Sequence, residues 1–330
     1  MRTHEAMNPK TLENKGRCIA LGLFILVSGC AAPDPHPFQQ YATAVKDTGN
    51  GLEQLLTQDV AWSKERYIES VLSGSTSLRN TAVLDEKQRF TISFPTSEGI
   101  TNQPTFYKLQ NAQATLLNLN DATEKYVNLL TTLAGADLVN PTTFESMAKD
   151  TDASLNAATK QLDLQVPGGA LHVFSVGSSE IIRLLIEHRR QAALIKVLTE
   201  SQPAIDAYSD KCLRLLTILD QSLLTDYQAQ AFFLDDAFSR IPAEKRPEDP
   251  KARAAVEQLI KLNSDYLTLV QSLKSLHKVF ETLPKGHREL LKSAQKQPTS
   301  LEEIRSLAEE AKRLQSIYKE LNQPNAGKKG

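Results

Sequence analysis

The sequence has no excess of charge of either sign. It contains 38 lysines and arginines against 39 aspartates and glutamates, which leaves a net charge of −1 when histidine is neutral. Proteins that bind nucleic acid through its phosphates carry a basic excess on at least one face. The near balance therefore argues against a nucleic-acid-binding protein.

Motifs for catalysis and metal binding are also missing. No two histidines stand four residues apart, and the Glu187-His188 pair is not part of a zincin motif. Residues 168–169 and 176–179 complete neither a phosphate-binding loop nor a Gly-x-Ser-x-Gly elbow. Asp235-Asp236 offers half of a metal site, although a polar helix face is the simpler interpretation. We therefore predict a protein that is not an enzyme and binds no cofactor and no metal ion, with its histidines exposed or satisfied by hydrogen bonds.

Long apolar runs are absent, apart from one near the start of the chain. Residues 18–27 are apolar except for Gly22, and they follow Lys15 and Arg17. This run is about half of the roughly 20 apolar residues that a membrane-spanning helix needs. A basic start, a short apolar core and small residues after it form the layout of a secretion signal.

The end of this signal, residues 27–30 with the sequence Val-Ser-Gly-Cys, resembles the lipobox of bacterial lipoproteins. The resemblance covers about the first 32 residues. In that family a peptidase cuts before the cysteine, which carries lipid as the new N-terminus. The resemblance therefore implies that residues 1–29 are removed and that Cys30 is lipidated. A plain secretion signal cut near the same place is the alternative, and either Met1 or Met7 can be the true start.

The same resemblance implies a location and a free thiol. In bacteria with two membranes, an aspartate after the cysteine retains such proteins at the inner membrane. Ala31 stands there, which implies the outer membrane, facing the periplasm; in a cell with one membrane, the outer face of the plasma membrane is implied. Removal of the signal changes the net charge to −3 and leaves Cys212 with no internal disulfide partner. We expect Cys212 to be a buried, inert thiol.

The mature chain divides into a tether, a long helical region and a tail. Residues 30–37 contain three prolines and predict a stiff, extended tether. Residues 38–323 are expected to form one helical bundle domain, and residues 324–330 a disordered tail. Three more prolines and several charges in residues 242–250 predict an exposed link, where the domain can be subdivided.

Apolar residues at alternating steps of three and four predict helices through most of this region. The expected helices cover about 38–73, 105–134, 141–166, 170–200, 202–241, 251–283 and 299–322, with a short one after 286. In 105–134 the two apolar positions per heptad indicate the seam of a helical bundle. We predict an all-α fold: an elongated antiparallel bundle of about six to seven helices.

Glycine and proline set several of the expected boundaries. Gly49 and Gly51 suggest a bend in the first helix, Gln202-Pro203 a helix start, and residues 284–286 a helix break. Ser300 and Glu303 have the spacing of a capping box at the start of the last helix. Trp62 is expected to pack in the core.

Residues 73–104 lack helical periodicity and are rich in Ser, Thr, Asn and Gly. Within them Phe90, Ile92 and Phe94 alternate with polar residues, which predicts a short strand over 89–95 with no evident partner strand. The segment is either a surface excursion that fills a gap between helices or an edge strand to which a partner binds.

These features favour a lipid-anchored cell-envelope protein, in which the helical region is a non-enzymatic scaffold or protein-interaction module for another envelope protein. Three alternatives remain open. One is a binding protein for a small molecule or lipid, with a cavity near the apolar segment 170–200. The others are an inhibitor or immunity lipoprotein and an enzyme that acts on the cell wall.

Overall fold

The computed structural model describes residues 33–72, 81–84, 90–95, 101–102, 105–135, 140–161 and 179–322. The signal segment, Cys30 and the tail 324–330 lie outside these residues, so the predictions made for them stay predictions. The described chain forms seven helices and three short strands, which are α2 (His36–Leu72), β1 (Thr81–Leu84), β2 (Phe90–Pro95), β3 (Thr101–Asn102), α3 (Thr105–Ala134), α4 (Pro141–Gln161), α5 (Ser179–Ile186), α6 (Arg190–Ser239), α7 (Pro250–Ala294) and α8 (Glu302–Asn322).

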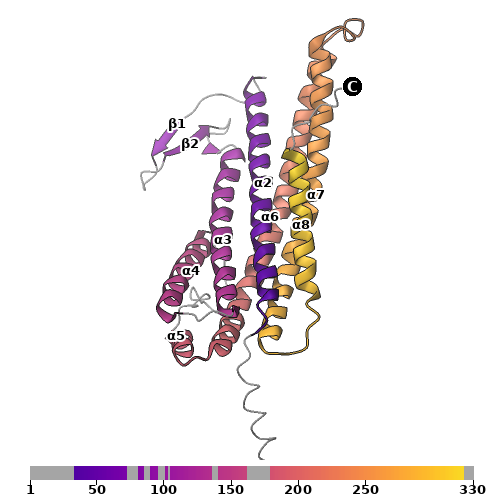
Figure 1. Ribbon diagram of the computed structural model, residues 1–330. Helices are drawn as coiled ribbons and strands as arrows, with labels where there is room; N and C mark the ends of the chain where they lie inside the picture. The colour runs from indigo at the N-terminus through magenta and orange to yellow at the C-terminus, as the bar shows by residue number, and fades with distance from the viewer. Residues whose placement is uncertain are drawn as a thin grey trace, which may run out of the picture.

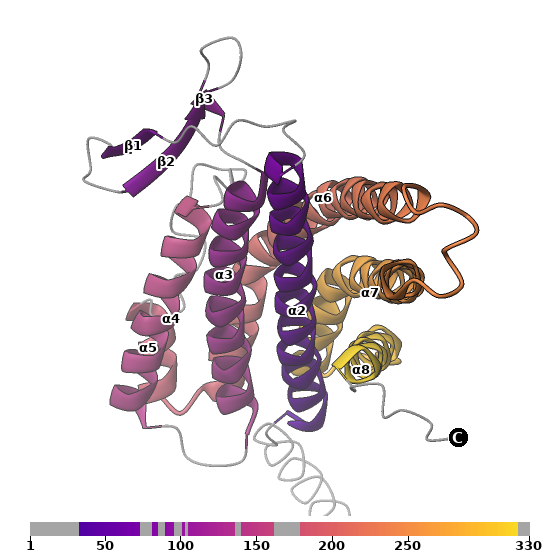
Figure 2. The same ribbon diagram turned by 90° about the horizontal axis from the view of Figure 1, so that it is seen from above.

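The helices pack side by side as an elongated bundle, which confirms the predicted all-α fold (Figure 1). Helix α2 lies at its centre and contacts α3, α6, α7 and α8. Figure 2 shows α3, α4 and α5 on one side of α2 and α7 and α8 on the other. The core runs along α2, whose Tyr41, Leu55 and Leu56 are almost fully buried.

Helices α6 and α7 form a long antiparallel hairpin. Helix α6 has 50 residues, which at 1.5 Å per residue gives a length of about 75 Å. The far end of the hairpin extends beyond the end of α2 (Figure 1). The side chain of Asp249 accepts hydrogen bonds from the backbone N–H groups of Lys251 and Ala252 at 2.7 and 3.4 Å and so caps the start of α7.

The helix boundaries predicted around residues 186–203 are wrong. The chain turns at residues 187–189, where His188 has a φ of 56°, and α6 then continues through Pro203 without a break. Arg190 fixes the turn, because its guanidinium donates to the carbonyl oxygens of Thr132 and Leu133 at the end of α3. Pro203 is tolerated because the carbonyl that it leaves unpaired in the helix belongs to Thr199, which is exposed to water.

The helix break predicted at residues 284–286 is also wrong, since α7 runs from Pro250 to Ala294. Pro284 has no N–H group, so the carbonyl of Phe280 loses its partner within the helix. The hydroxyl of Ser209 on α6 donates to that carbonyl instead. Contacts from another helix therefore replace the missing hydrogen bond and keep α7 continuous.

The last helix is capped differently from the predicted Ser300–Glu303 capping box. Helix α8 begins at Glu302, whose N–H donates to Ser300 Oγ at 3.4 Å. The N–H of Ile304 donates at 3.1 Å to the carboxylate of Glu289, which belongs to α7. A carboxylate near the N-terminus of a helix is also favoured by the helix dipole. The cap of α8 is thus supplied across the α7–α8 contact.

Gly49 and Gly51 do not bend α2, which is one helix. They allow two neighbours to approach it closely on different faces. A Cβ atom on Gly49 would lie 1.8 Å from the side-chain amide of Asn120 on α3, and one on Gly51 would lie 2.2 Å from Leu314 on α8. The glycines therefore serve packing rather than a change of direction.

The strand predicted over 89–95 is confirmed as β2. It pairs antiparallel with β1, with Thr81 opposite Ser93, and with β3, with Phe94 opposite Asn102. The two partner strands were not found from the sequence, because four and two residues are too short to show a clear alternation.

Candidate functional site

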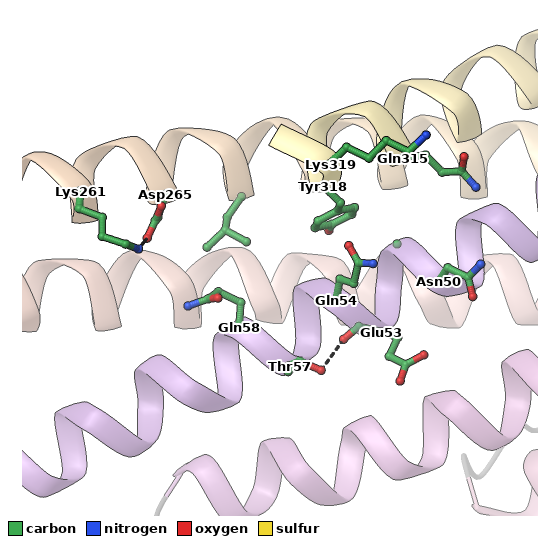
Figure 3. A pocket seen from close by; sticks show the side chains of 12 residues that line it. Asn50, Glu53, Gln54, Thr57, Gln58, Lys261, Asp265, Gln315, Tyr318 and Lys319 are labelled. Carbon is green, nitrogen blue, oxygen red and sulfur yellow. Dashed lines mark hydrogen bonds and ion pairs between the residues drawn. The ribbon is translucent and has the colours of Figure 1, made fainter. Parts of the chain in front are cut away.

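A groove with a volume of about 840 Å³ lies between α2, α7 and α8. Figure 3 shows that its lining side chains come from all three helices and are mostly polar. Amide, charged and aromatic groups line it together: Gln54, Gln58, Lys261, Asp265, Tyr318 and Lys319. The groove is on the other side of α2 from α5, which forms part of the apolar segment 170–200 beside which a ligand cavity was expected (Figure 2).

The polar groups of the groove are partly engaged with one another. Lys261 and Asp265 form an ion pair one helical turn apart on α7. Thr57 Oγ1 donates to the carbonyl of Glu53 at 2.8 Å and accepts from Gln113 Nε2 of α3 at 2.9 Å. The groove therefore brings charges of both signs, several amides and the ring of Tyr318 together on three helices.

Two carboxyl groups lie buried across the contact between α2 and α6. Asp59 on α2 and Asp226 on α6 both have exposed fractions of 0%. Arg66 Nη1 lies 2.8 Å from Asp226 Oδ1, and Arg66 itself reaches the surface. Among the described residues, no donor makes a normal hydrogen bond to either oxygen of Asp59 or to Oδ2 of Asp226.

Burial disturbs the titration of both carboxyl groups. The pKa of Asp59 is raised to about 7, first by burial and then by the negative charge of Asp226, while Ser222 and Arg66 oppose the rise. The pKa of Asp226 is raised to about 6 by burial, and the guanidinium of Arg66 opposes that rise. Fully buried carboxyl groups with raised pKa values are uncommon outside functional sites and charge networks.

A second polar cluster lies in the core around His287 of α7, which is fully buried. Its Nε2 atom is 2.7 Å from the hydroxyl of Tyr126 on α3, and its Nδ1 atom is 2.7 Å from Oε1 of Gln202 on α6. Burial, and then the positive charge of Arg288, lowers the pKa of His287 to about 3. The ring is therefore neutral, with Nδ1–H donating to Gln202 and the Tyr126 hydroxyl donating to Nε2.

Ser201 also belongs to this cluster, with its Oγ 3.5 Å from Nε2 of His287. A serine beside a histidine is the arrangement of a nucleophile and its base. However, Ser201 has an exposed fraction of 1%, and its hydroxyl donates to the carbonyl of Val197 at 2.7 Å. The cluster therefore connects α3, α6 and α7 within the core and offers no open side to a substrate.

The other residues singled out from the sequence lie either in the core or at exposed and half-buried positions. Cys212 and Trp62 are buried, as expected, and burial raises the pKa of the Cys212 thiol. His188 is exposed and His277 is half-buried. Asp236 forms an ion pair with Arg240 at 2.6 Å, in agreement with a polar helix face. Within the described part of the chain, no three Asp, Glu, His or Cys side chains are grouped to hold a metal ion.

The α6–α7 hairpin exposes large apolar side chains. On α7, Ile260 and Leu267 have exposed fractions of 64% and 62%, and Val256 is also exposed. On α6, Ile218 and Phe232 are exposed to a similar degree. Steps of four and seven residues place Val256, Ile260 and Leu267 on one face of α7. We call these three residues the α7 row.

Comparisons of the chain with protein-family models, with curated proteins and with solved structures find no match. A search of the helices in the described residues finds none with the length and apolarity needed to cross a membrane.

Proposed function

We propose that the protein is a lipid-anchored cell-envelope scaffold that binds another envelope protein through the α6–α7 hairpin. The observation that carries this proposal is the α7 row, because it exposes apolar side chains on a helix that already has a buried face. Leu262 and Leu269 form that buried face and pack inside the bundle. The α7 row is thus a second apolar surface, which the described helices leave uncovered.

The surroundings of the α7 row fit a helical interaction surface. Arg253 pairs with Glu257 at 2.9 Å, and Lys261 pairs with Asp265, both at a spacing of four residues. An apolar row flanked by charged residues is typical of helices that bind another helix. Exposed apolar rows on soluble proteins commonly mark sites of protein interaction.

The position of the hairpin supports a scaffold that presents this surface away from a membrane. Helix α2 begins at His36, six residues after Cys30, so the lipid on Cys30 would hold this end of the bundle near the bilayer. The 37 residues of α2 span about 55 Å, and the hairpin extends beyond its far end (Figure 1). The hairpin tip would therefore stand about 55 Å or more from the anchor.

The binding surface can be tested by site-specific photo-cross-linking in intact cells. A photoreactive amino acid at position 260 is expected to give one discrete adduct with another protein, whereas the same amino acid at Gln258 gives none. Gln258 is exposed on a different face of the same helical turn, which makes it a matched control. Changing Val256 and Leu267 to serine should remove the adduct. Equal adducts from positions 260 and 258 would contradict the proposed surface.

The anchor is tested by changing Cys30 to alanine. We expect the unprocessed precursor to accumulate and the incorporation of radiolabelled fatty acid to be abolished, because the thioether to the lipid requires the cysteine sulfur. The Cys212→Ala variant is the control, since Cys212 is buried and should leave labelling unchanged. Unchanged labelling in Cys30→Ala would rule out this anchor without affecting the cross-linking test.

A further inference from the structure

The buried acidic pair lies at the place where α2 meets the α6–α7 hairpin. Asp59 and Ser63 are one turn apart on α2, and Ser222 and Asp226 are one turn apart on α6. Ser222 lies close enough to Asp59 to lower its pKa, although the two make no hydrogen bond of normal geometry. The hydroxyl oxygen of Ser63, which has an exposed fraction of 1%, is also unpartnered among the described residues. Polar oxygens with no donor are costly in a protein interior.

The charges at this contact do not cancel when both carboxyl groups are ionised. The pair then carries two negative charges, and Arg66 supplies one positive charge to Asp226. On α7, Lys261 and Asp265 line the groove between α2, α7 and α8 and neutralise each other. One unbalanced negative charge would remain on Asp59, which is fully buried. Burial of an unpaired charge is strongly unfavourable.

A single positive charge balances the contact, whereas a divalent ion would leave an excess of one. The described residues offer no set of three metal-ligating side chains at this place. A proton needs no such set, because a carboxylic acid can donate its O–H to a neighbouring carboxylate. It would also supply one donor between two carboxyl groups whose oxygens lack hydrogen bonds of normal geometry.

We propose that Asp59 and Asp226 form a proton-binding site that holds one shared proton at neutral pH and joins α2 to the α6–α7 hairpin. Loss of this proton leaves two buried negative charges facing each other across the contact. The contact between α2 and α6 then loosens, and the hairpin gains mobility. This inference does not depend on the lipid anchor or on a protein partner.

The direction of the pH effect follows from the raised pKa values. The pKa values of Asp59 and Asp226, about 7 and about 6, lie above the ordinary value of 3.8. The folded chain therefore keeps a proton that the unfolded chain releases. The stability from this proton is complete below about pH 4 and is lost as the pH rises through about 7. Because the two groups interact, these values describe the pair rather than each residue.

The test compares the thermal stability of the full chain with that of Asp59→Asn across pH 4.5 to 8.5. Asparagine has the same shape, cannot ionise and donates a hydrogen bond to Asp226. We expect its Tm to equal that of the unchanged chain near pH 4.5 and to exceed it by about 5 °C near pH 8. Asp210→Asn, on an exposed position of α6, should show no such difference. A constant difference between Asp59→Asn and the unchanged chain at all pH values would overturn the proposal.

Two further measurements distinguish a proton from a metal ion and from a merely structural role. Replacing sodium and potassium chloride with choline chloride at pH 7 should leave the Tm unchanged, and a loss of stability would overturn the proposal in favour of a bound metal ion. Carbon-13 NMR of labelled aspartate should show a carboxyl signal that titrates near pH 7 and disappears in Asp59→Asn. The proposal also fails if all aspartates titrate below about pH 5.

Discussion

Replacing His287 with alanine is expected to lower the free energy of unfolding at pH 7 by about 4 kcal/mol. The change removes a fully buried ring and leaves a cavity where α3, α6 and α7 meet. It also leaves the hydroxyl of Tyr126 and the side-chain oxygen of Gln202 without their 2.7 Å partners. Equilibrium unfolding in urea, with the slopes of the two proteins compared, measures the loss.

Two variants separate the hydrogen bond from the loss of volume. Tyr126→Phe keeps the ring and removes only the hydroxyl, which contacts Nε2 of His287 and Oγ of Ser201, so we expect a loss of about 1–2 kcal/mol. His277→Ala lies on the same helix, is half-buried and has no described partner of this kind, so its effect should stay within about 0.5 kcal/mol. If His287→Ala costs no more than His277→Ala, the cluster does not hold the three helices together.

The pH dependence of His287 has the opposite sign to that of the acidic pair. The pKa of His287 is about 3, below its ordinary value of 6.5, so the folded chain holds a neutral ring that the unfolded chain protonates. Its contribution is complete above about pH 6.5 and is lost as the pH falls toward 3. As the pH falls, the acidic pair instead gains stability, because its shared proton is bound more fully. The two effects oppose each other between about pH 4 and 6.5, so the free energy of unfolding of the unchanged chain should vary little with pH there. Comparing the pH dependence of Asp59→Asn and of His287→Ala with that of the unchanged chain separates the two effects.

The sequence predicts the helices well where apolar periodicity decides the structure. The range 105–134 matches α3 at both ends, because the bundle seam spans nearly four heptads and Gly135 follows it. Predictions from proline fail at Pro203 and Pro284. The carbonyl left unpaired by Pro203 belongs to the exposed Thr199, and the one left unpaired by Pro284 accepts from Ser209. The second compensation depends on a residue far away in the chain and cannot be read from the local sequence.

The buried polar residues carry a weaker signal that the sequence analysis missed. Asp59 follows Leu55 and Leu56 at steps of four and three, and His287 follows Leu283 and precedes Leu290 at the same steps. Both are polar residues at positions where the helical periodicity calls for an apolar, core-facing residue. This mismatch is the signal that could have singled them out. The hydrogen-bond partners of His287 stand 85 and 161 residues away, so the pairing itself needs the fold. The α7 row was missed for a different reason. The apolar stripe of this helix is wide, and the sequence does not tell which part of it packs inside the bundle and which part is exposed.

Gly51→Leu is the second substitution with a large expected effect, a loss of about 3 kcal/mol in the free energy of unfolding. A Cβ atom at position 51 would lie 2.2 Å from Cδ2 of Leu314 and 3.3 Å from the ring of Tyr318. Those side chains have exposed fractions of 0% and 4%, so the added side chain has to displace buried, packed atoms. Leucine favours the helix by about 1 kcal/mol over glycine, which reduces the loss but does not reverse it.

The matched control is Asn50→Leu, which makes the same side chain one residue earlier. Asn50 is exposed, so the added leucine meets no buried neighbour, and its effect should stay within about 0.5 kcal/mol. Urea unfolding measures both variants, and amide hydrogen exchange should show faster exchange in α8 for Gly51→Leu alone, because α8 is the helix that must move. Combining Gly51→Ala with Leu314→Ala should cost less than the sum of the two single changes, since the smaller residue 314 makes room for the new methyl group. Equal losses from Gly51→Leu and Asn50→Leu would show that the close approach of α2 and α8 does not govern how α8 is held.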